Sequence, residues 1–216
     1  MHRLLVACAA VVLAVSSAGA AAAGPGAAGA NSWAFTCDAG PLTKDASRKK
    51  LTAALGAANV TEVRLTDDAD GHPYKETLLF ANKPGDDVKI TWGDDVDGAR
   101  KGPNQMMVAY SNSNRTDWRG PLGVRLGSTI AEVEAANGRP FAIMGFAQSE
   151  GSGQVMDWRG GALATAMRNC VLEIVFNAGD VEGAAAADAL IASDDPAVRA
   201  ANPIVGSMAL SFWQKR

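Results

Sequence analysis

A short pattern that occurs twice sets the expected fold of this chain. Segments 80–92 and 146–158 both begin with Phe-Ala and an amide residue, and both place a glycine five residues and a tryptophan twelve residues after the phenylalanine. Each segment is typical of a strand, a glycine-containing turn and a second strand, which together form a β-hairpin. A unit repeated in this way predicts a chain built from two related halves.

A helix signal precedes each hairpin. In the second half, Thr129 and Glu132 form a capping box, in which a hydroxyl and a carboxylate bind backbone N–H groups of the first helical turn. Gly138, followed closely by a proline, then ends this helix. In the first half, a helix is expected to begin after Thr43 and to place residues 51, 54 and 55 on its apolar side.

Further elements complete each half. Strands are expected over residues 105–111, 170–176 and 207–213, extra strand-forming chain over 61–75, and helices over 181–192 and 196–201. Helices that cover one face of antiparallel strands define the α+β class. The sequence therefore predicts an α+β fold of two helix-plus-antiparallel-sheet repeats, the first over residues 33–120 and the second over 121–216.

Two segments of the second half resemble known exported proteins. Residues 123–129 (Gly-Val-Arg-Leu-Gly-Ser-Thr), the helix after them and residues 137–141 (Asn-Gly-Arg-Pro-Phe) look like the repeat unit of SmpA/OmlA-like envelope proteins and of the β-lactamase-inhibitor-protein-like fold. Residues 193–203 (Ser-Asp-x-Pro-x-x-Arg-x-x-Asn-Pro) are similar to the ends of uncharacterised exported bacterial proteins. The resemblance implies a tandem α+β fold and an envelope location, and it assigns no binding residue.

The first 20 residues are typical of a secretory signal peptide. Arg3 supplies the positive charge, an apolar run follows to residue 15, and small residues lead to a cleavage site after Ala20, or after Ala22. The run is shorter than the roughly 20 residues that span a bilayer. Lipidation at Cys8 is the alternative, although too few apolar residues precede that cysteine. Residues 21–32 form a flexible lead-in, and the mature protein is expected in the periplasm or outside the cell.

Removal of this leader leaves two cysteines, Cys37 and Cys170. Two cysteines allow one pairing, and oxidising compartments favour its formation. We therefore expect a disulfide between Cys37 and Cys170, with two free core thiols as the alternative.

Charge excludes nucleic acid as a partner, and the distribution of apolar residues excludes a membrane span in the mature chain. Without Arg3 the chain carries 19 Lys and Arg against 23 Asp and Glu, a formal net charge of −4. Binding of nucleic acid requires a basic face that neutralises phosphates, so nucleic acid is not expected as a partner. A second long apolar run is missing from the sequence, so no transmembrane segment is expected after leader removal.

Few residues are candidates for catalysis or metal binding. His72 is the one histidine left after leader removal, and it lies in a turn-forming Asp-Gly-His-Pro segment. Residues 66–71 resemble a calcium loop but place threonine where the first and last carboxylate ligands belong. Glu150 and Asp157 could act as paired carboxylates. No metal and no cofactor are expected, and a small periplasmic hydrolase that uses carboxylates or His72 is the alternative function.

A repeated tetrapeptide supplies the candidate binding residues. Asp-Trp-Arg-Gly occurs at 117–120 and again at 157–160. Tryptophan and arginine are enriched at interface hot spots, so Trp118, Arg119, Trp158 and Arg159 are the candidates, with core packing of the tryptophan rings as the alternative. The expected function is that of an exported non-catalytic binding or envelope-assembly protein, whose partner is another envelope or extracellular protein.

Overall fold

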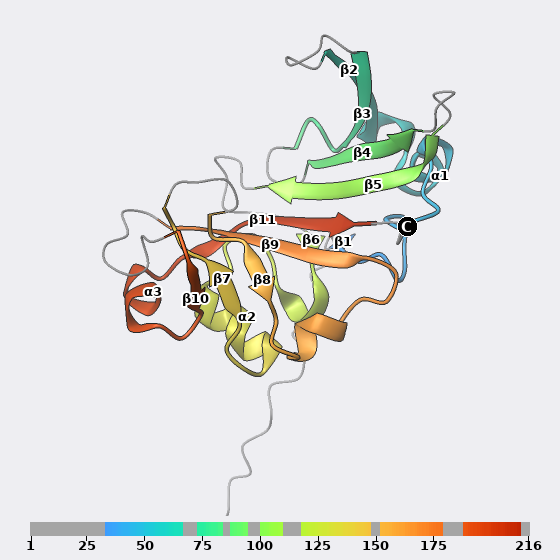
Figure 1. Cartoon of the computed structure of the whole chain (residues 1–216). Helices are drawn as coiled ribbons and strands as arrows, with labels where there is room; N and C mark the ends of the chain where they lie inside the picture. Colours follow the sequence, from blue (N-terminus) through green and yellow to red (C-terminus); the bar gives the residue numbers. More distant parts are fainter. Residues whose placement is uncertain are drawn as a thin grey trace, which may run out of the picture.

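A six-stranded antiparallel sheet forms the centre of the computed structural model, which describes residues 33–66, 73–83, 87–94, 100–109, 118–147, 152–178 and 188–212. Its strands, in spatial order, are β2 (Val60–Thr66), β3 (Pro73–Leu79), β4 (Val88–Asp94), β5 (Arg100–Ala109), β11 (Ile204–Ser211) and β9 (Val171–Asn177). The sheet twists strongly, so that β2 and β3 stand nearly upright where β5, β11 and β9 run across the view (Figure 1).

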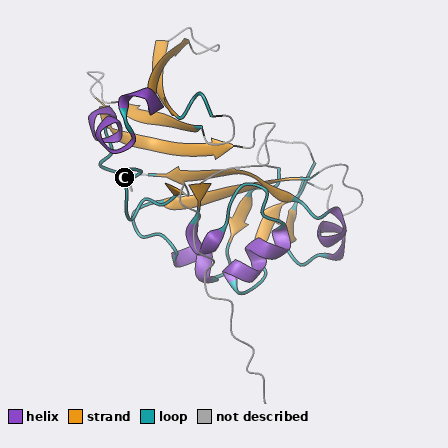
Figure 2. Cartoon of the chain, turned by 180° about the vertical axis from the view of Figure 1, so that it is seen from behind, coloured by secondary structure: helices purple, strands orange, loops and turns teal. Residues whose placement is uncertain are grey.

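Within the described ranges, two smaller sheets and three helices complete the fold. The strands are β10 (Leu190–Ala192), β7 (Ala142–Met144) and β8 (Val155–Asp157) in one sheet, and β1 (Trp33–Ala34) paired with β6 (Trp118–Arg119) in the other. The helices are α1 (Arg48–Leu55), α2 (Ile130–Asn137) and α3 (Pro196–Ala201), with short 3-10 turns at η1 (Ala57–Asn59), η2 (Pro121–Gly123) and η3 (Ala162–Thr165). Figures 1 and 2 place α2 and α3 beside the β10-β7-β8 sheet, and α1 at the other end of the molecule. The predicted α+β class is confirmed.

Both predicted hairpins are present. In the first, β3 pairs with β4 so that Leu79 lies opposite Val88, and in the second, β7 pairs with β8 so that Ile143 lies opposite Val155. The large sheet nevertheless combines the two halves of the chain, because β5 of the first half pairs with β11 of the second. The expected boundary between residues 120 and 121 therefore does not separate one sheet from the other.

The helix that follows Thr129 forms as predicted. The Thr129 hydroxyl accepts a hydrogen bond from Glu132 N at 3.2 Å, and the Glu132 carboxylate accepts one from Thr129 N at 2.8 Å. Gly138 ends the helix in the left-handed conformation, with φ of 76°. Such a conformation favours glycine because it has no Cβ. Ile130 and Val133 are fully buried, so the apolar face of α2 points into the core.

Two helix predictions are wrong in part. Helix α1 is capped by Ser47 instead of Thr43, because the Ser47 hydroxyl accepts a hydrogen bond from Lys50 N at 3.3 Å, and Ala54 on this helix is exposed. The expected helix over 181–192 does not include its last three residues, which pair with β7 as strand β10. Pairing with a distant strand overrides the local helix propensity of this alanine-rich segment. Helix α3 has the predicted bounds and is capped by Asp195.

Two aromatic clusters organise the core. Trp118 packs edge-on against Phe35 and Phe80, with ring centroids 5.9 and 6.0 Å apart. Phe141 packs against Trp158 and Phe176, with ring centroids 5.2 and 5.9 Å apart. Both clusters belong to one continuous set of buried apolar residues, so the parts of the fold share a single core.

Several predicted features lie outside the described residues. They are the signal peptide over residues 1–20, the whole lead-in over 21–32, residues 67–71 of the calcium-like loop, His72, Glu150 and residues 181–187 of the expected helix over 181–192. Within the described ranges, no helix is long and apolar enough to cross a membrane.

Candidate functional site

The predicted Trp-Arg pairs do not form a common exposed site. Trp118 has no exposed surface and belongs to the core, which corrects its assignment as a surface binding residue. Arg119, next to it on β6, is half-buried. Trp158 is half-buried against Phe141, so core packing describes both rings. The repeated tetrapeptide could not distinguish these positions, since tryptophan favours interfaces and cores alike.

The second Trp-Arg pair lies in a turn held by its neighbours. Arg159 is exposed and has a positive φ of 51°. Its N–H donates to the Asp157 carboxylate at 2.7 Å, and its carbonyl accepts a hydrogen bond from Arg139 at 3.1 Å. The Asp157 carboxylate therefore stabilises this turn locally. Its proposed partner in a carboxylate pair, Glu150, lies outside the described residues.

The motif over residues 193–203 connects α3 to α2. Ser193 donates to the Glu134 carboxylate and accepts a hydrogen bond from Phe141 N at 3.0 Å. Arg199, on α3, forms an ion pair with the same Glu134 carboxylate. Asp195 caps α3 by accepting from Ala197 N at 2.8 Å. Ser193, Asp195 and Arg199 of this motif thus have structural partners, and Glu134 is the partner that the motif alone did not reveal.

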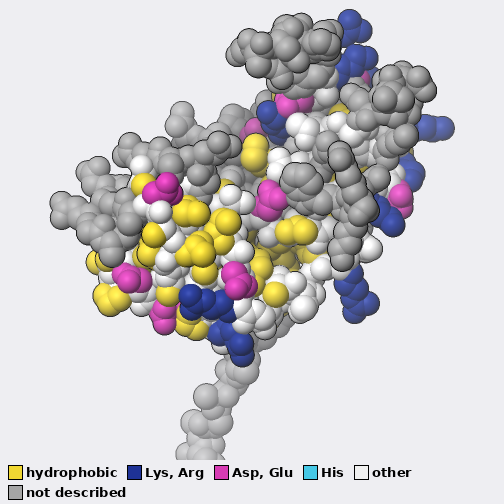
Figure 3. Space-filling view, in the orientation of Figure 1, with side chains coloured by type: hydrophobic (Ala, Val, Ile, Leu, Met, Phe, Trp, Pro, Cys, Tyr) yellow, Lys and Arg dark blue, Asp and Glu magenta, His cyan; other side chains and the backbone are white. Residues whose placement is uncertain are grey.

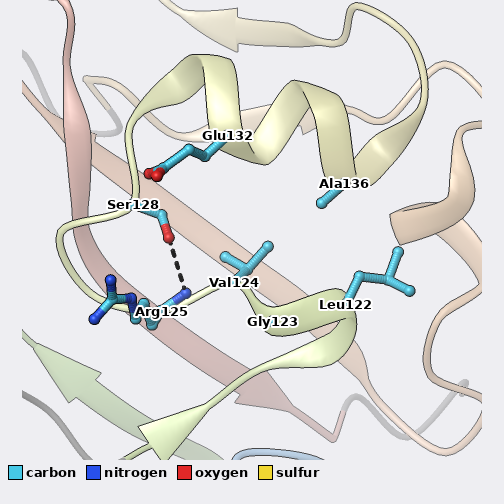
Figure 4. A pocket seen from close by; sticks show the side chains of 7 residues that line it. All are labelled: Leu122, Gly123, Val124, Arg125, Ser128, Glu132 and Ala136. Carbon is cyan, nitrogen blue, oxygen red and sulfur yellow. Dashed lines mark hydrogen bonds between the residues drawn. The ribbon is translucent and has the colours of Figure 1, made fainter. Parts of the chain in front are cut away.

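A hollow between η2 and α2 is the first surface cavity (Figure 4). Its volume is about 260 Å³, and it is lined by Leu122, Gly123, Val124, Arg125, Ser128, Glu132 and Ala136. The Ser128 hydroxyl accepts a hydrogen bond from Arg125 N at 3.3 Å, and Glu132 belongs to the capping box of α2. Because these groups already have partners within the chain, the hollow is explained by local structure.

A second cavity lies on the face of the large sheet that points away from the core. Along β9, Leu172, Ile174 and Phe176 are buried, whereas Glu173 and Val175 between them point to the opposite face, as alternation along a strand requires. On that face lies a cavity of about 350 Å³, lined by Gln105, Met107, Ser152, Gln154, Glu173, Val175, Ser207 and Ala209. We call this cavity the sheet-face groove.

The floor of the sheet-face groove comes from three neighbouring strands. Gln105 on β5 donates from its amide to the Glu173 carboxylate on β9 at 3.0 Å and to the Ser211 hydroxyl on β11 at 3.3 Å. The bond to Glu173 crosses β11, which lies between β5 and β9. The polar side chains of the floor are therefore held in fixed positions, with apolar surface of Met107, Val175 and Ala209 around them.

The wall of the groove is the turn that leads into β8. Gly153 N donates to Met144 O at 3.0 Å, and Phe176 N donates to Gly153 O at 2.9 Å, so the turn is attached to both β7 and β9. A Cβ at Gly153 would lie 2.2 Å from Phe176 O, and only glycine fits there. The backbone on either side of Gly153 is thereby fixed, and with it the position of Ser152.

Ser152 is the unusual residue of the groove. Its hydroxyl is buried and has no hydrogen-bond partner in the part of the chain that the structure describes. A buried hydroxyl without a partner costs roughly 1–3 kcal/mol, so such groups are rare in native proteins. In the sequence, Ser152 stands out only by its place in a glycine-rich hairpin turn, and such a turn does not indicate a site.

Apolar side chains also gather on the outer face of the small sheet. Met156 on β8 is 51% exposed and Leu190 on β10 is 62% exposed, while Met144 on β7 is half-buried. Figure 3 shows hydrophobic surface over these three strands. Patches of this kind occur at contact surfaces.

The predicted cysteine pair lies at disulfide distance. The Cα atoms of Cys37 and Cys170 are 6.1 Å apart, and their sulfur atoms are bonded. The bond joins the segment after β1 to the start of β9 across 133 residues of sequence. Within the described ranges, no group of three or more His, Cys, Asp and Glu side chains could hold a metal ion.

Comparison with known proteins adds one distant likeness. No protein family matches the sequence, and no curated protein matches it. Among solved structures, the uncharacterised protein YfeY from Escherichia coli is 14% identical, with a TM-score of 0.44, over 80% of this chain and 94% of that protein. This likeness carries over no residue role, and it does not confirm the resemblance to SmpA/OmlA-like or β-lactamase-inhibitor-protein-like repeats.

Proposed function

We propose that this chain is an exported, non-catalytic binding protein whose sheet-face groove receives a segment of another envelope or extracellular protein. The observation that carries the proposal is the buried Ser152 hydroxyl without a hydrogen-bond partner. A donor or acceptor of a bound partner completes its hydrogen bonding and removes the energetic cost that the free protein bears.

The composition of the groove suits a protein partner. Amide, hydroxyl and carboxylate groups alternate with the apolar side chains of Met107, Val175 and Ala209. Non-obligate protein–protein interfaces combine apolar contacts with directed hydrogen bonds in this way. The fixed bond between Gln105 and Glu173 means that the polar groups are already in place before a partner arrives.

The geometry at Ser152 favours binding over catalysis. A serine nucleophile requires a general base within hydrogen-bond distance of its hydroxyl. Among the described residues, the Ser152 hydroxyl has no such neighbour. We therefore assign Ser152 to recognition of a partner. The hydrolase alternative depends on His72 and Glu150, which lie outside the described ranges, and on Asp157, whose carboxylate accepts a hydrogen bond from Arg159 N.

Partner capture with groove variants tests this proposal. Ala209 lines the floor of the groove and is 6% exposed. A tryptophan side chain at this position has no space except the groove itself, so Ala209→Trp fills it. Val171→Trp is the matched control, since Val171 lies on the same face of β9, outside the groove, and is 54% exposed. The immobilised mature chain is exposed to envelope extract of its source, and retained proteins are quantified by mass spectrometry.

We expect one protein to be retained by the wild-type chain and by Val171→Trp, and to be lost with Ala209→Trp. Thermal unfolding of each variant shows whether it is folded. If folded Ala209→Trp retains the same proteins as the control, the groove is not the binding site.

A further inference from the structure

We infer that Cys37, Cys170 and Met167 form a binding site for Cu(I) once the disulfide between the two cysteines is reduced. The inference is independent of the sheet-face groove. It rests on three sulfur atoms that distant parts of the sequence bring together, two from cysteine and one from methionine.

The Met167 side chain lies close to both cysteine sulfurs. Its Sδ lies 3.4 Å from Cys170 Sγ and 3.8 Å from Cys37 Sγ, so one thioether contacts both cysteine sulfurs. A metal ion held by three sulfurs at about 2.3 Å each, in one plane, requires sulfur atoms spaced about 4 Å apart. Two of the three spacings are therefore close to this value before any metal binds.

The third spacing opens when the disulfide is broken. The Cα atoms of Cys37 and Cys170 are 6.1 Å apart, which leaves room for the two Sγ atoms to separate by side-chain rotation alone. The backbone therefore does not need to move for the three sulfurs to surround an ion.

Asp38 keeps this arrangement in place without the disulfide. Its carboxylate accepts hydrogen bonds from Arg168 N at 3.1 Å, from Asn169 N at 3.2 Å and from the Asn169 amide at 2.8 Å. The loop between Met167 and Cys170 is thus attached to the residue that follows Cys37. A site held by a second set of bonds survives reduction, whereas one held by the disulfide alone would come apart.

The ligand set selects the metal. Thiolate and thioether sulfurs are soft donors, and they favour Cu(I) over the hard divalent ions that prefer oxygen. The Asp38 carboxylate, 3.8 Å from Cys37 Sγ, is a hard donor that is already bound to backbone N–H groups. Cys37 is 2% exposed, whereas Cys170 and Met167 are half-buried, so an ion can enter from the side of these two residues.

The copper site forms in two steps, reduction of the disulfide and binding of Cu(I). A dithiol reductant passes two electrons and two protons to the disulfide, which yields two thiols and the reductant's own disulfide. Cu(I) then displaces the two thiol protons and accepts the Met167 thioether as third ligand, which gives a complex of net charge −1. The copper ion does not change its oxidation state.

Titration with Cu(I) tests the inference on the full mature chain. The protein is reduced with a phosphine under nitrogen, the phosphine is removed, and Cu(I) is titrated against the chromophoric chelator bicinchoninate. We expect one Cu(I) per chain. Met167→Leu should weaken binding about tenfold or more, since loss of even an outer-shell partner weakens metal sites that much. Met156→Leu, which alters an exposed methionine on β8, is the control and should bind as the wild type does.

X-ray absorption at the copper edge provides a readout that does not depend on affinity. We expect three sulfur neighbours in the wild type and in Met156→Leu, and two in Met167→Leu. Circular dichroism of the reduced chain reports whether it is folded. Two sulfur neighbours in the folded wild type, or equal affinity of Met167→Leu and wild type, would overturn the assignment.

Discussion

Single polar side chains hold together parts of this molecule that are far apart in sequence. Asn137, which is 2% exposed, donates from its amide to Arg139 O at 3.0 Å and Trp158 O at 3.1 Å, and it accepts from Leu163 N at 3.1 Å. One side chain therefore satisfies three backbone groups where α2, β8 and η3 meet. A buried polar residue with all its bonds formed in this way specifies one arrangement of the surrounding segments.

Glycine at position 153 is required by the contact that positions the groove wall. We expect Gly153→Ala to destabilise the protein by about 3 kcal/mol or more, because the new Cβ overlaps Phe176 O and φ is positive. Gly138→Ala is the matched control, since φ is also positive there but the space is open, and it should cost only about 1 kcal/mol. Urea denaturation measures both. Equal losses would show that the overlap at Gly153 is relieved at little cost.

At the scale of elements, α2 and α3 are joined by the bonds around Glu134. We expect Glu134→Ala to destabilise more than Arg199→Ala, by about 1 kcal/mol or more. The first change removes the ion pair and also leaves the buried Ser193 hydroxyl without its acceptor, whereas the second removes the ion pair alone. Thermal or urea unfolding of both variants measures the difference.

A surface ion pair provides the comparison for this prediction. Lys75 Nζ lies 3.5 Å from Glu62 Oε1, and the lysine side chain is 44% exposed. Lys75→Ala should therefore change the free energy of unfolding by no more than about 1 kcal/mol. Equal losses of stability in Arg199→Ala and Glu134→Ala would show that the bond from Ser193 to Glu134 adds nothing to the joining of α2 and α3.

Elements whose signals are local could be predicted from the sequence. The capping box at Thr129, the turn at Gly138, the start of α3 at Asp195 and both hairpins depend on residues a few positions apart, and each forms as expected. The strand at 190–192 could not be predicted, since its partner β7 lies more than 40 residues earlier in the chain. Pairing over such distances depends on the tertiary fold.

The same distinction explains why the candidate site changed. Trp118 and Trp158 stand out in the sequence because their tetrapeptide is repeated, but burial of each ring is decided by Phe35, Phe80 and Phe141 from other segments. The sheet-face groove combines residues from β5, β9, β11 and the turn before β8. None of these has a local motif, so the groove becomes visible only once the register of the strands is known.

At the scale of the whole molecule, one sheet unites the two halves. A hairpin alone leaves unpaired edges, and the pairing of β5 with β11 covers one edge from each half. The turn before β8 covers part of β9 through the bridge between Gln154 and Val175. The groove lies where these pieces meet, so it requires both halves of the chain.

The central claim is that this groove binds a partner through Ser152, and the Ser152→Ala variant tests it most directly. Removal of a buried hydroxyl without a partner should stabilise the free protein by about 1 kcal/mol or more, and should weaken binding of the captured partner about tenfold. Ser128→Ala removes a buried hydroxyl that has a partner in Arg125 N, so it should destabilise the protein and leave binding unchanged. Urea unfolding and partner titration of both variants provide the measurement. A Ser152→Ala protein that is less stable than the wild type, or that binds the partner equally well, would contradict the account.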